Sequence, residues 1–171
     1  FPNQKNIEYF PDKIYFFGEY WKSCMRFPLN VENLVVYGFP YFQQQKMKYK
    51  EIKKRKGTIL IISQGTIGNK LSEFIWECKE VLKNYNISYK LHPGEYDGWK
   101  TKYPDLLKLS ELDNLTVIDN NSKNLYEYLA ESEFVIGVYS TAIYEALSFK
   151  CKVILVDLPG IEYVEGLIEK D

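Results

Sequence analysis

One stretch of the sequence joins an apolar run to a hydroxyl-bearing turn. Residues 134–138 predict a buried strand, and the pattern after them predicts a helix that begins at Ser140 or Thr141. Both hydroxyls suit an N-cap, and the free N–H groups and the dipole of a helix start attract phosphate. Glu145 lies four residues after Thr141 on the same helix face, where a carboxylate suits ribose hydroxyls. The stretch predicts a nucleotide pocket, or else an ordinary cap followed by a surface glutamate.

The single histidine, His92, follows a second apolar run, residues 87–91, and precedes Pro93, which stiffens the turn. An imidazole in this position could neutralise a leaving phosphate or donate a proton to it. The alternative is a structural histidine bonded to the loop backbone. Glu95 and Asp97 follow closely enough to suggest a metal, but we expect both to be solvated loop acids.

A glycine-bearing turn, residues 63–69, joins a third apolar run to a predicted helix. Gln64, Gly65 and Thr66, together with Gly68, could let backbone N–H groups approach a phosphate or a sugar. The spacing matches neither the dinucleotide fingerprint nor the Walker loop, which argues against NAD binding and ATP hydrolysis.

From residue 57 onward, predicted strands alternate with predicted helices, which indicates an α/β fold with a Rossmann-like, doubly wound parallel sheet. The predicted strands cover residues 58–62, 87–91, 115–118, 134–138 and 153–156, and the predicted helices cover residues 70–85, 98–109, 125–130 and the segments after 141 and 160. Ligands of such sheets bind beyond the carboxyl ends of the strands. We therefore expect the 63–69 turn, His92 with Pro93, residues 119–122, Ser140 with Thr141, and residues 157–160 to line one rim.

Residues 57–171 form the predicted domain, and residues 1–56 form a lead-in segment that we expect to pack along its edge. The lead-in holds two predicted short strands, 14–17 and 34–37. Its last part, 46–56, is rich in lysine, so it could make peripheral contact with an anionic membrane surface. The simpler interpretation is a solvated linker or helix face.

The formal net charge of −1 favours no nucleic-acid partner. Cys24, Cys78 and Cys151 are too scattered for a disulfide framework or a zinc site, and we expect the last two to be buried thiols. No signal peptide or membrane-spanning run is present. These features predict a cytoplasmic protein that could associate with the inner face of the cell membrane. Because the chain begins with Phe and stops inside a predicted helix, we also expect a fragment of a longer protein.

Two short motifs resemble those of bacterial capsule and cell-surface glycosyltransferases. Lys90-Leu91-His92-Pro93 resembles their HP motif, and Ser140-Thr141 with Glu145 resembles their S/T motif. The group includes sialyltransferases, polysialyltransferases and, more distantly, teichoic-acid polymerases. The resemblance covers roughly residues 57–160, and residues 36–40 resemble the segment leading into them. It implies one half of a GT-B fold, in which two Rossmann-like domains enclose the active site.

By this resemblance, His92 would contact the phosphate or base of a donor, Ser140 and Thr141 its phosphate, and Glu145 its ribose. The general base would belong to a missing amino-terminal domain. The expected function is donor binding for transfer from a nucleotide sugar, such as CMP-sialic acid, to a glycan acceptor, without metal or other cofactor. Alternatives are an epimerase of the UDP-GlcNAc 2-epimerase type and a non-catalytic Rossmann-like binding module.

Overall fold

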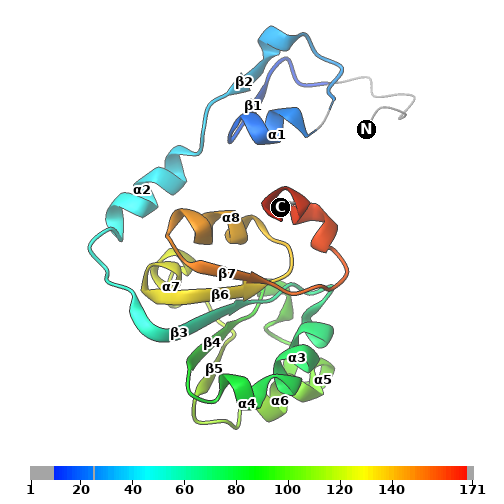
Figure 1. The fold of residues 1–171 in the computed structure, drawn as a ribbon. Helices are drawn as coiled ribbons and strands as arrows, with labels where there is room; N and C mark the ends of the chain where they lie inside the picture. The colour runs from blue at the N-terminus through cyan, green and yellow to red at the C-terminus, as the bar shows by residue number, and fades with distance from the viewer. Residues whose placement is uncertain (1–9, 25, 169–171) are drawn as a thin grey trace. The chain divides into compact units, whose positions relative to one another are not determined.

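The computed structural model describes residues 10–24 and 26–168 (Figure 1). The chain divides into two compact units between Lys48 and Tyr49. The predicted domain division after residue 56 and the predicted packing of the lead-in along the sheet stay predictions.

The first unit contains a short parallel pair of strands, β1 (Ile14–Phe16) and β2 (Leu34–Val36). Both lie within one residue of their predicted positions. The unit also contains α1 (Glu19–Ser23), the 3₁₀ turn η1 (Val31–Asn33) and α2 (Pro40–Lys48). Aromatic contacts hold these segments together: the ring centroids of Phe17 and Phe39 are 4.7 Å apart, and those of Phe16 and Phe27 are 5.3 Å apart.

The second unit is built on a five-stranded, entirely parallel sheet with the order β5-β4-β3-β6-β7. Its strands are β3 (Arg55–Ile62), β4 (Asn86–Lys90), β5 (Leu115–Ile118), β6 (Ser132–Gly137) and β7 (Lys152–Leu155). Successive strands run outward from β3 to one edge and then from β6 to the other. The order therefore reverses between β3 and β6, and the predicted Rossmann-like α/β class is confirmed. In such sheets a crevice forms outside the carboxyl ends of the strands at the reversal.

Helices cover both faces of this sheet (Figure 1). One face carries α3 (Gly68–Glu77), α5 (Trp99–Lys102) and α6 (Pro104–Leu109), with α4 (Lys79–Leu82) after α3; the other carries α7 (Leu125–Glu131) and α8 (Thr141–Ser148). Neighbouring residues of β3 point to opposite faces: Ile61 belongs to the core that includes Leu71 and Leu106. Leu60, pointing the other way, is also fully buried. Burial on both faces explains why the strands are continuous apolar runs.

Three predicted helices differ from the observed elements. The predicted helix 70–85 is interrupted at Cys78, whose backbone (φ −83°, ψ 0°) leaves the α conformation. As a result Cys78 is only half-buried, and Phe74 and Val81 are exposed rather than on the apolar face. The predicted helix 98–109 is split into α5 and α6 because the residue before Pro104 is held out of the helical conformation. The predicted last helix is the 3₁₀ segment η3 (Ile161–Leu167).

Two basic residues of the lysine-rich segment 46–56 make contacts within the second unit. The ammonium of Lys54 donates to the Leu129 carbonyl at 2.6 Å and lies 3.0 Å from the sulfur of Cys151, which is buried as predicted. Arg55 pairs with Glu131 at 3.3 Å. The role predicted for the rest of the 46–56 segment stays a prediction. In residues 10–24 and 26–168, no helix has the length and apolar character needed to cross a bilayer.

Candidate functional site

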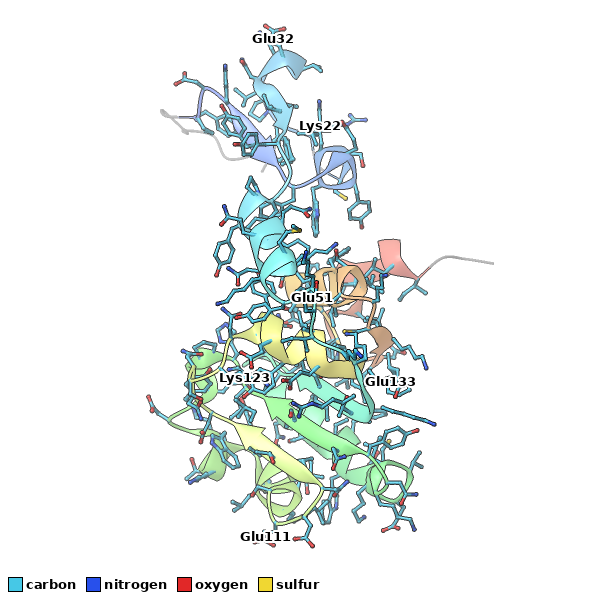
Figure 2. The ribbon with its side chains drawn as sticks, turned by 90° about the vertical axis from the view of Figure 1, so that its left-hand side faces the viewer. Lys22, Glu32, Glu51, Glu111, Lys123 and Glu133 are labelled. Atoms are coloured by element: carbon cyan, nitrogen blue, oxygen red, sulfur yellow. The ribbon has the colours of Figure 1, made fainter. Side chains whose placement is uncertain are left out.

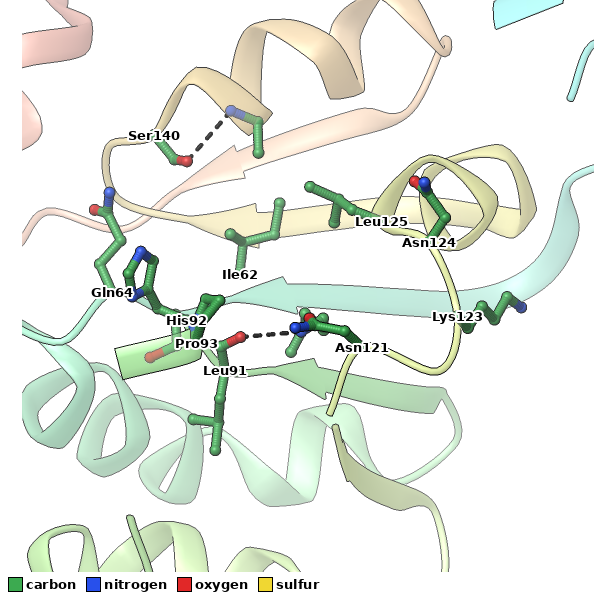
Figure 3. Close-up of a pocket in the computed structure, with 13 residues that line it drawn as sticks. Ile62, Gln64, Leu91, His92, Pro93, Asn121, Lys123, Asn124, Leu125 and Ser140 are labelled. Carbon is green, nitrogen blue, oxygen red and sulfur yellow. Dashed lines mark hydrogen bonds between the residues drawn. The ribbon is translucent and has the colours of Figure 1, made fainter. Parts of the chain in front are cut away.

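A cavity of about 400 Å³ opens at the carboxyl ends of β3 and β4 and at the starts of α7 and α8 (Figure 3). Its position at the reversal of strand order is where ligands of such sheets bind, and its volume fits a small organic ligand. It is lined by Ile62, Ser63, Gln64, Lys90, Leu91, His92, Pro93, Asn121, Lys123, Asn124, Leu125, Ser140 and Ala142.

The cavity brings together four of the residues predicted from sequence: Gln64, His92, Pro93 and Ser140. These come from three loops that lie far apart in the chain. The other four, Gly65, Thr66, Thr141 and Glu145, are not among the lining residues.

Ser140 is the N-cap of α8, as the sequence predicts. Its backbone is extended, and its hydroxyl oxygen accepts a hydrogen bond from the N–H of Ala142 at 3.2 Å. Such a cap contributes about 1 kcal/mol to stability. Because the oxygen serves as acceptor, the hydroxyl proton is available to a ligand. Thr141 is the first residue of the helix, and it is exposed.

The 63–69 turn is tied to the turn before α8, because the hydroxyls of Thr66 and Tyr139 are hydrogen-bonded at 2.5 Å. Gln64 lines the cavity, and its buried side-chain oxygen has no hydrogen-bond partner among the described residues. Gly68 is required by packing: a Cβ there would lie 2.6 Å from the ring of Tyr103 and would overlap the carboxylate of Glu95. Close packing therefore explains why this residue is glycine, and the predicted approach of its backbone N–H to a ligand stays a prediction.

His92 is exposed at the rim and also bonded to its own loop. The ring nitrogen Nδ1 of His92 accepts a hydrogen bond from the Gly94 backbone N–H at 3.2 Å. The backbone N–H of His92 donates to the carboxylate of Glu95 at 2.6 Å. A neutral imidazole that accepts at Nδ1 carries its proton on Nε2. The loop contact predicted for a structural histidine is thus present, and Nε2–H remains available as a donor to a ligand.

The prediction that Glu95 is a solvated loop acid is wrong. Its side chain is buried, and one carboxylate oxygen accepts the hydroxyl of Ser63 at 2.9 Å while the other accepts the N–H of His92. In the folded chain Glu95 lies beneath the 63–69 turn. This contact could not be predicted from sequence because Ser63 and Glu95 are 32 residues apart. Asp97 is exposed, as predicted. Among the described residues, no cluster of His, Cys, Asp and Glu could hold a metal ion.

Glu145 is only partly exposed to solvent. The Tyr126 hydroxyl donates to its carboxylate at 3.0 Å, and the side chain is half-buried, so Glu145 is not a fully solvated residue. Burial raises the pKa of Glu145 above its usual range, opposed by the hydrogen bond from Tyr126. The predicted contact with ribose stays a prediction.

Replacing Glu145 by glutamine tests this environment. Below the unfolded-state pKa the carboxyl is protonated in both states, so its ionisation has no effect on folding. As the pH rises through that pKa toward the higher folded-state pKa, ionisation destabilises the folded wild type. The melting temperature of Glu145→Gln minus that of wild type should therefore increase from pH 4 to pH 7. The increase should be about 2–4 °C for each kcal/mol by which ionisation of Glu145 lowers the free energy of unfolding of wild type. Thermal unfolding at both pH values measures it. Glu77→Gln, at an exposed position, is the control, and a difference that falls with pH would contradict the burial.

Several lining residues were not assigned a role from sequence. Lys90 is buried at the end of β4, Lys123 precedes α7, and Asn124 caps α7 by accepting the N–H of Tyr126 at 2.9 Å. Asn124 could have been found from its position as a capping residue before the predicted helix 125–130. Lys90 carries no such signal, because a lysine at the end of an apolar run looks like a strand end that enters solvent.

No family model matches this chain, and no curated protein sequence matches it. Among solved structures, the wall teichoic acid polymerase TagF is similar at a TM-score of 0.53 and 16% identity, over 91% of this chain and 41% of TagF. The β-Kdo 2,4-transferase KpsC of Thermosulfurimonas dismutans is similar at 0.40 and 18% identity, over 70% of this chain and 46% of KpsC. The UDP-GlcNAc 2-epimerase of Methanocaldococcus jannaschii, solved with UDP-GlcNAc and UDP, is similar at 0.46 and 16% identity, over 75% of this chain and 42% of the epimerase.

The likeness to TagF shows the fold alone: a Rossmann-like parallel sheet with helices on both faces. This chain spans less than half the length of each of these three proteins.

Proposed function

We propose that this chain is the donor-binding half of a GT-B glycosyltransferase that acts in surface-polysaccharide synthesis. The observation that carries the proposal is the convergence of His92, Gln64 and Ser140 on one cavity at the reversal of strand order. The comparisons support it, because TagF and KpsC are described as a wall teichoic acid polymerase and a Kdo transferase. A nucleotide sugar would be the donor, with CMP-sialic acid as one candidate, and a glycan would be the acceptor.

The cavity would hold the donor and stabilise its leaving group. An acceptor hydroxyl attacks the anomeric carbon, the bond from that carbon to the phosphate oxygen breaks, and the nucleotide leaves with the negative charge. The hydroxyl of Ser140, the N–H groups that begin α8 and Nε2–H of His92 would meet this charge. Thr141 would add a hydroxyl at the helix start, and Glu145 would contact ribose. No residue of the cavity is proposed as the base that deprotonates the acceptor, and we assign that role to a further domain.

A nucleotide titration tests the donor pocket. CMP, CDP, UDP and GDP are titrated calorimetrically against wild type and His92→Ala. At least one nucleotide should bind, and loss of the hydrogen bond from Nε2 to a charged phosphate should weaken it about tenfold or more. Glu80→Gln, which changes an exposed charge on α4, is the matched control and should bind as wild type does. The absence of binding by all four nucleotides would reject the pocket.

The epimerase remains a second candidate, because one structural neighbour is a UDP-GlcNAc 2-epimerase. Product analysis with the complete protein separates the two enzymes: sugar transferred to an acceptor supports the first, and an epimerised nucleotide sugar supports the second. A non-catalytic module predicts that His92→Ala and Ser140→Ala leave the activity of the complete protein intact. We also propose a cytoplasmic location and peripheral contact with the membrane through residues 46–56.

A further inference from the structure

Lys90 places a buried positive charge beside the cavity. It is the last residue of β4, and only 8% of its surface is exposed. Its ammonium donates to the carbonyl of Leu91 at 3.2 Å and to the hydroxyl of Tyr96, and it lies 4.8 Å from the centre of the Tyr96 ring. These protein partners are neutral, so none of them compensates the charge.

The second lysine at the cavity differs in this respect. Lys123 pairs with Glu131 at 2.7 Å and with Glu127 at 3.5 Å, so its charge is neutralised locally. In the part of the chain that the structure describes, no carboxylate lies within ion-pair distance of Lys90. A buried charge is costly unless it is paired. An ammonium has three N–H donors, and the two contacts leave one for a ligand.

The position of this ammonium is held by the loop after β5. The hydroxyl of Tyr96, which accepts from Lys90, in turn donates to the side-chain oxygen of Asn121 at 2.8 Å and lies 3.1 Å from the carbonyl of Asn120. Asn121 lines the cavity as well (Figure 3). Tyr96 and Asn121 are therefore positioning residues that keep the lysine at the end of β4.

We infer that Lys90 is the counter-charge for a phosphate of the bound ligand, so that the cavity selects nucleotides over nucleosides through this residue. The inference rests on the proposed function, since it concerns the same cavity. It adds the place of the ligand's anionic group, between β4 and the start of α8, and it assigns the counter-charge to Lys90 rather than to Lys123.

The test compares a nucleotide with its nucleoside. Wild type, Lys90→Gln, Lys123→Gln and Lys83→Gln are titrated with CMP and cytidine, or with whichever of the four nucleotides binds most tightly and its nucleoside. Lys83 pairs with Glu80 just before the beginning of β4, at the opposite end of that strand from Lys90, and is the control for loss of one surface charge. We expect Lys90→Gln to weaken the nucleotide about tenfold or more and the nucleoside less than about twofold. Lys123→Gln should cause a smaller loss than Lys90→Gln.

Two results would overturn the inference: wild-type nucleotide affinity in folded Lys90→Gln, or a loss in Lys123→Gln as large as that in Lys90→Gln. If wild type binds none of the nucleotides, the proposed function fails instead. Should Lys90→Gln not fold, a crystal structure of wild type with the nucleotide decides the matter. A phosphate oxygen within about 4 Å of the Lys90 nitrogen supports the inference, and a phosphate held elsewhere in the cavity contradicts it.

Discussion

Gly68→Ala is expected to lower the free energy of unfolding by about 3 kcal/mol. The added methyl group would lie 2.6–2.7 Å from the ring and hydroxyl of Tyr103 and would overlap the Glu95 carboxylate. Both neighbours are buried, so neither can swing into solvent. Overpacking of this kind costs about 1–3 kcal/mol, and displacement of Glu95 would also weaken its bonds to Ser63 and His92.

Urea unfolding followed by circular dichroism measures the effect. Gly65→Ala is the matched control, because a methyl group there meets only an ordinary contact, 3.8 Å from Glu95. It should change the free energy of unfolding by less than about 1 kcal/mol. Equal stability of the two variants would mean that the space around Gly68 is not closed.

Glu95→Ala is expected to cost about 2–4 kcal/mol and to weaken nucleotide binding. The truncation removes the acceptor of the Ser63 hydroxyl and of the His92 N–H, and it leaves a cavity beneath the 63–69 turn. Because the bond to His92 fixes the turn that carries the imidazole, the His92 ring should be less ordered. Nucleotide affinity should then fall toward that of His92→Ala.

Denaturant unfolding and nucleotide titration of Glu95→Ala measure both effects. Asp97→Ala removes an exposed acid two residues away and should leave both quantities close to wild type. The double variant Gly68→Ala with Glu95→Ala should cost less than the sum of the single variants, because truncating Glu95 removes part of the clash. Strict additivity would show that the two residues do not share this space.

Two charged residues of the second unit, Lys123 and Glu133, are both paired within it. Figure 2 shows Lys123 and Glu133 well apart on the second unit. Lys123 precedes α7 and pairs with Glu131 at the end of that helix, whereas Glu133 lies at the beginning of β6, where it pairs with Lys152 at 2.9 Å and accepts the N–H of Gly57. Those contacts lower the pKa of Glu133, and the backbone hydrogen bond from Gly57 makes the largest contribution. Lys90, the last residue of β4, in contrast has no carboxylate within ion-pair distance among the described residues.

The class of the fold could be predicted from the sequence because local patterns carry it. A parallel strand covered on both faces must be an apolar run, and five such runs separated by helical patterns leave few alternatives. The strand 115–118 was predicted with its observed bounds. The rule that carboxyl ends of parallel strands share one edge predicted that Gln64, His92 and Ser140 lie on one rim, and in the structure all three line the same cavity.

The tertiary structure alone decided the environment of the polar side chains. Glu95 is buried and bonded to Ser63, 32 positions away, and Glu145 is half-buried and accepts a hydrogen bond from Tyr126, 19 positions away. Lys90 is buried although it ends a strand. The sequence by itself determined which segments are strands and which ends they present, since hydrophobic periodicity is local. Burial, pairing and free charge depend on neighbours brought together by folding, and so they could be read only from the folded chain.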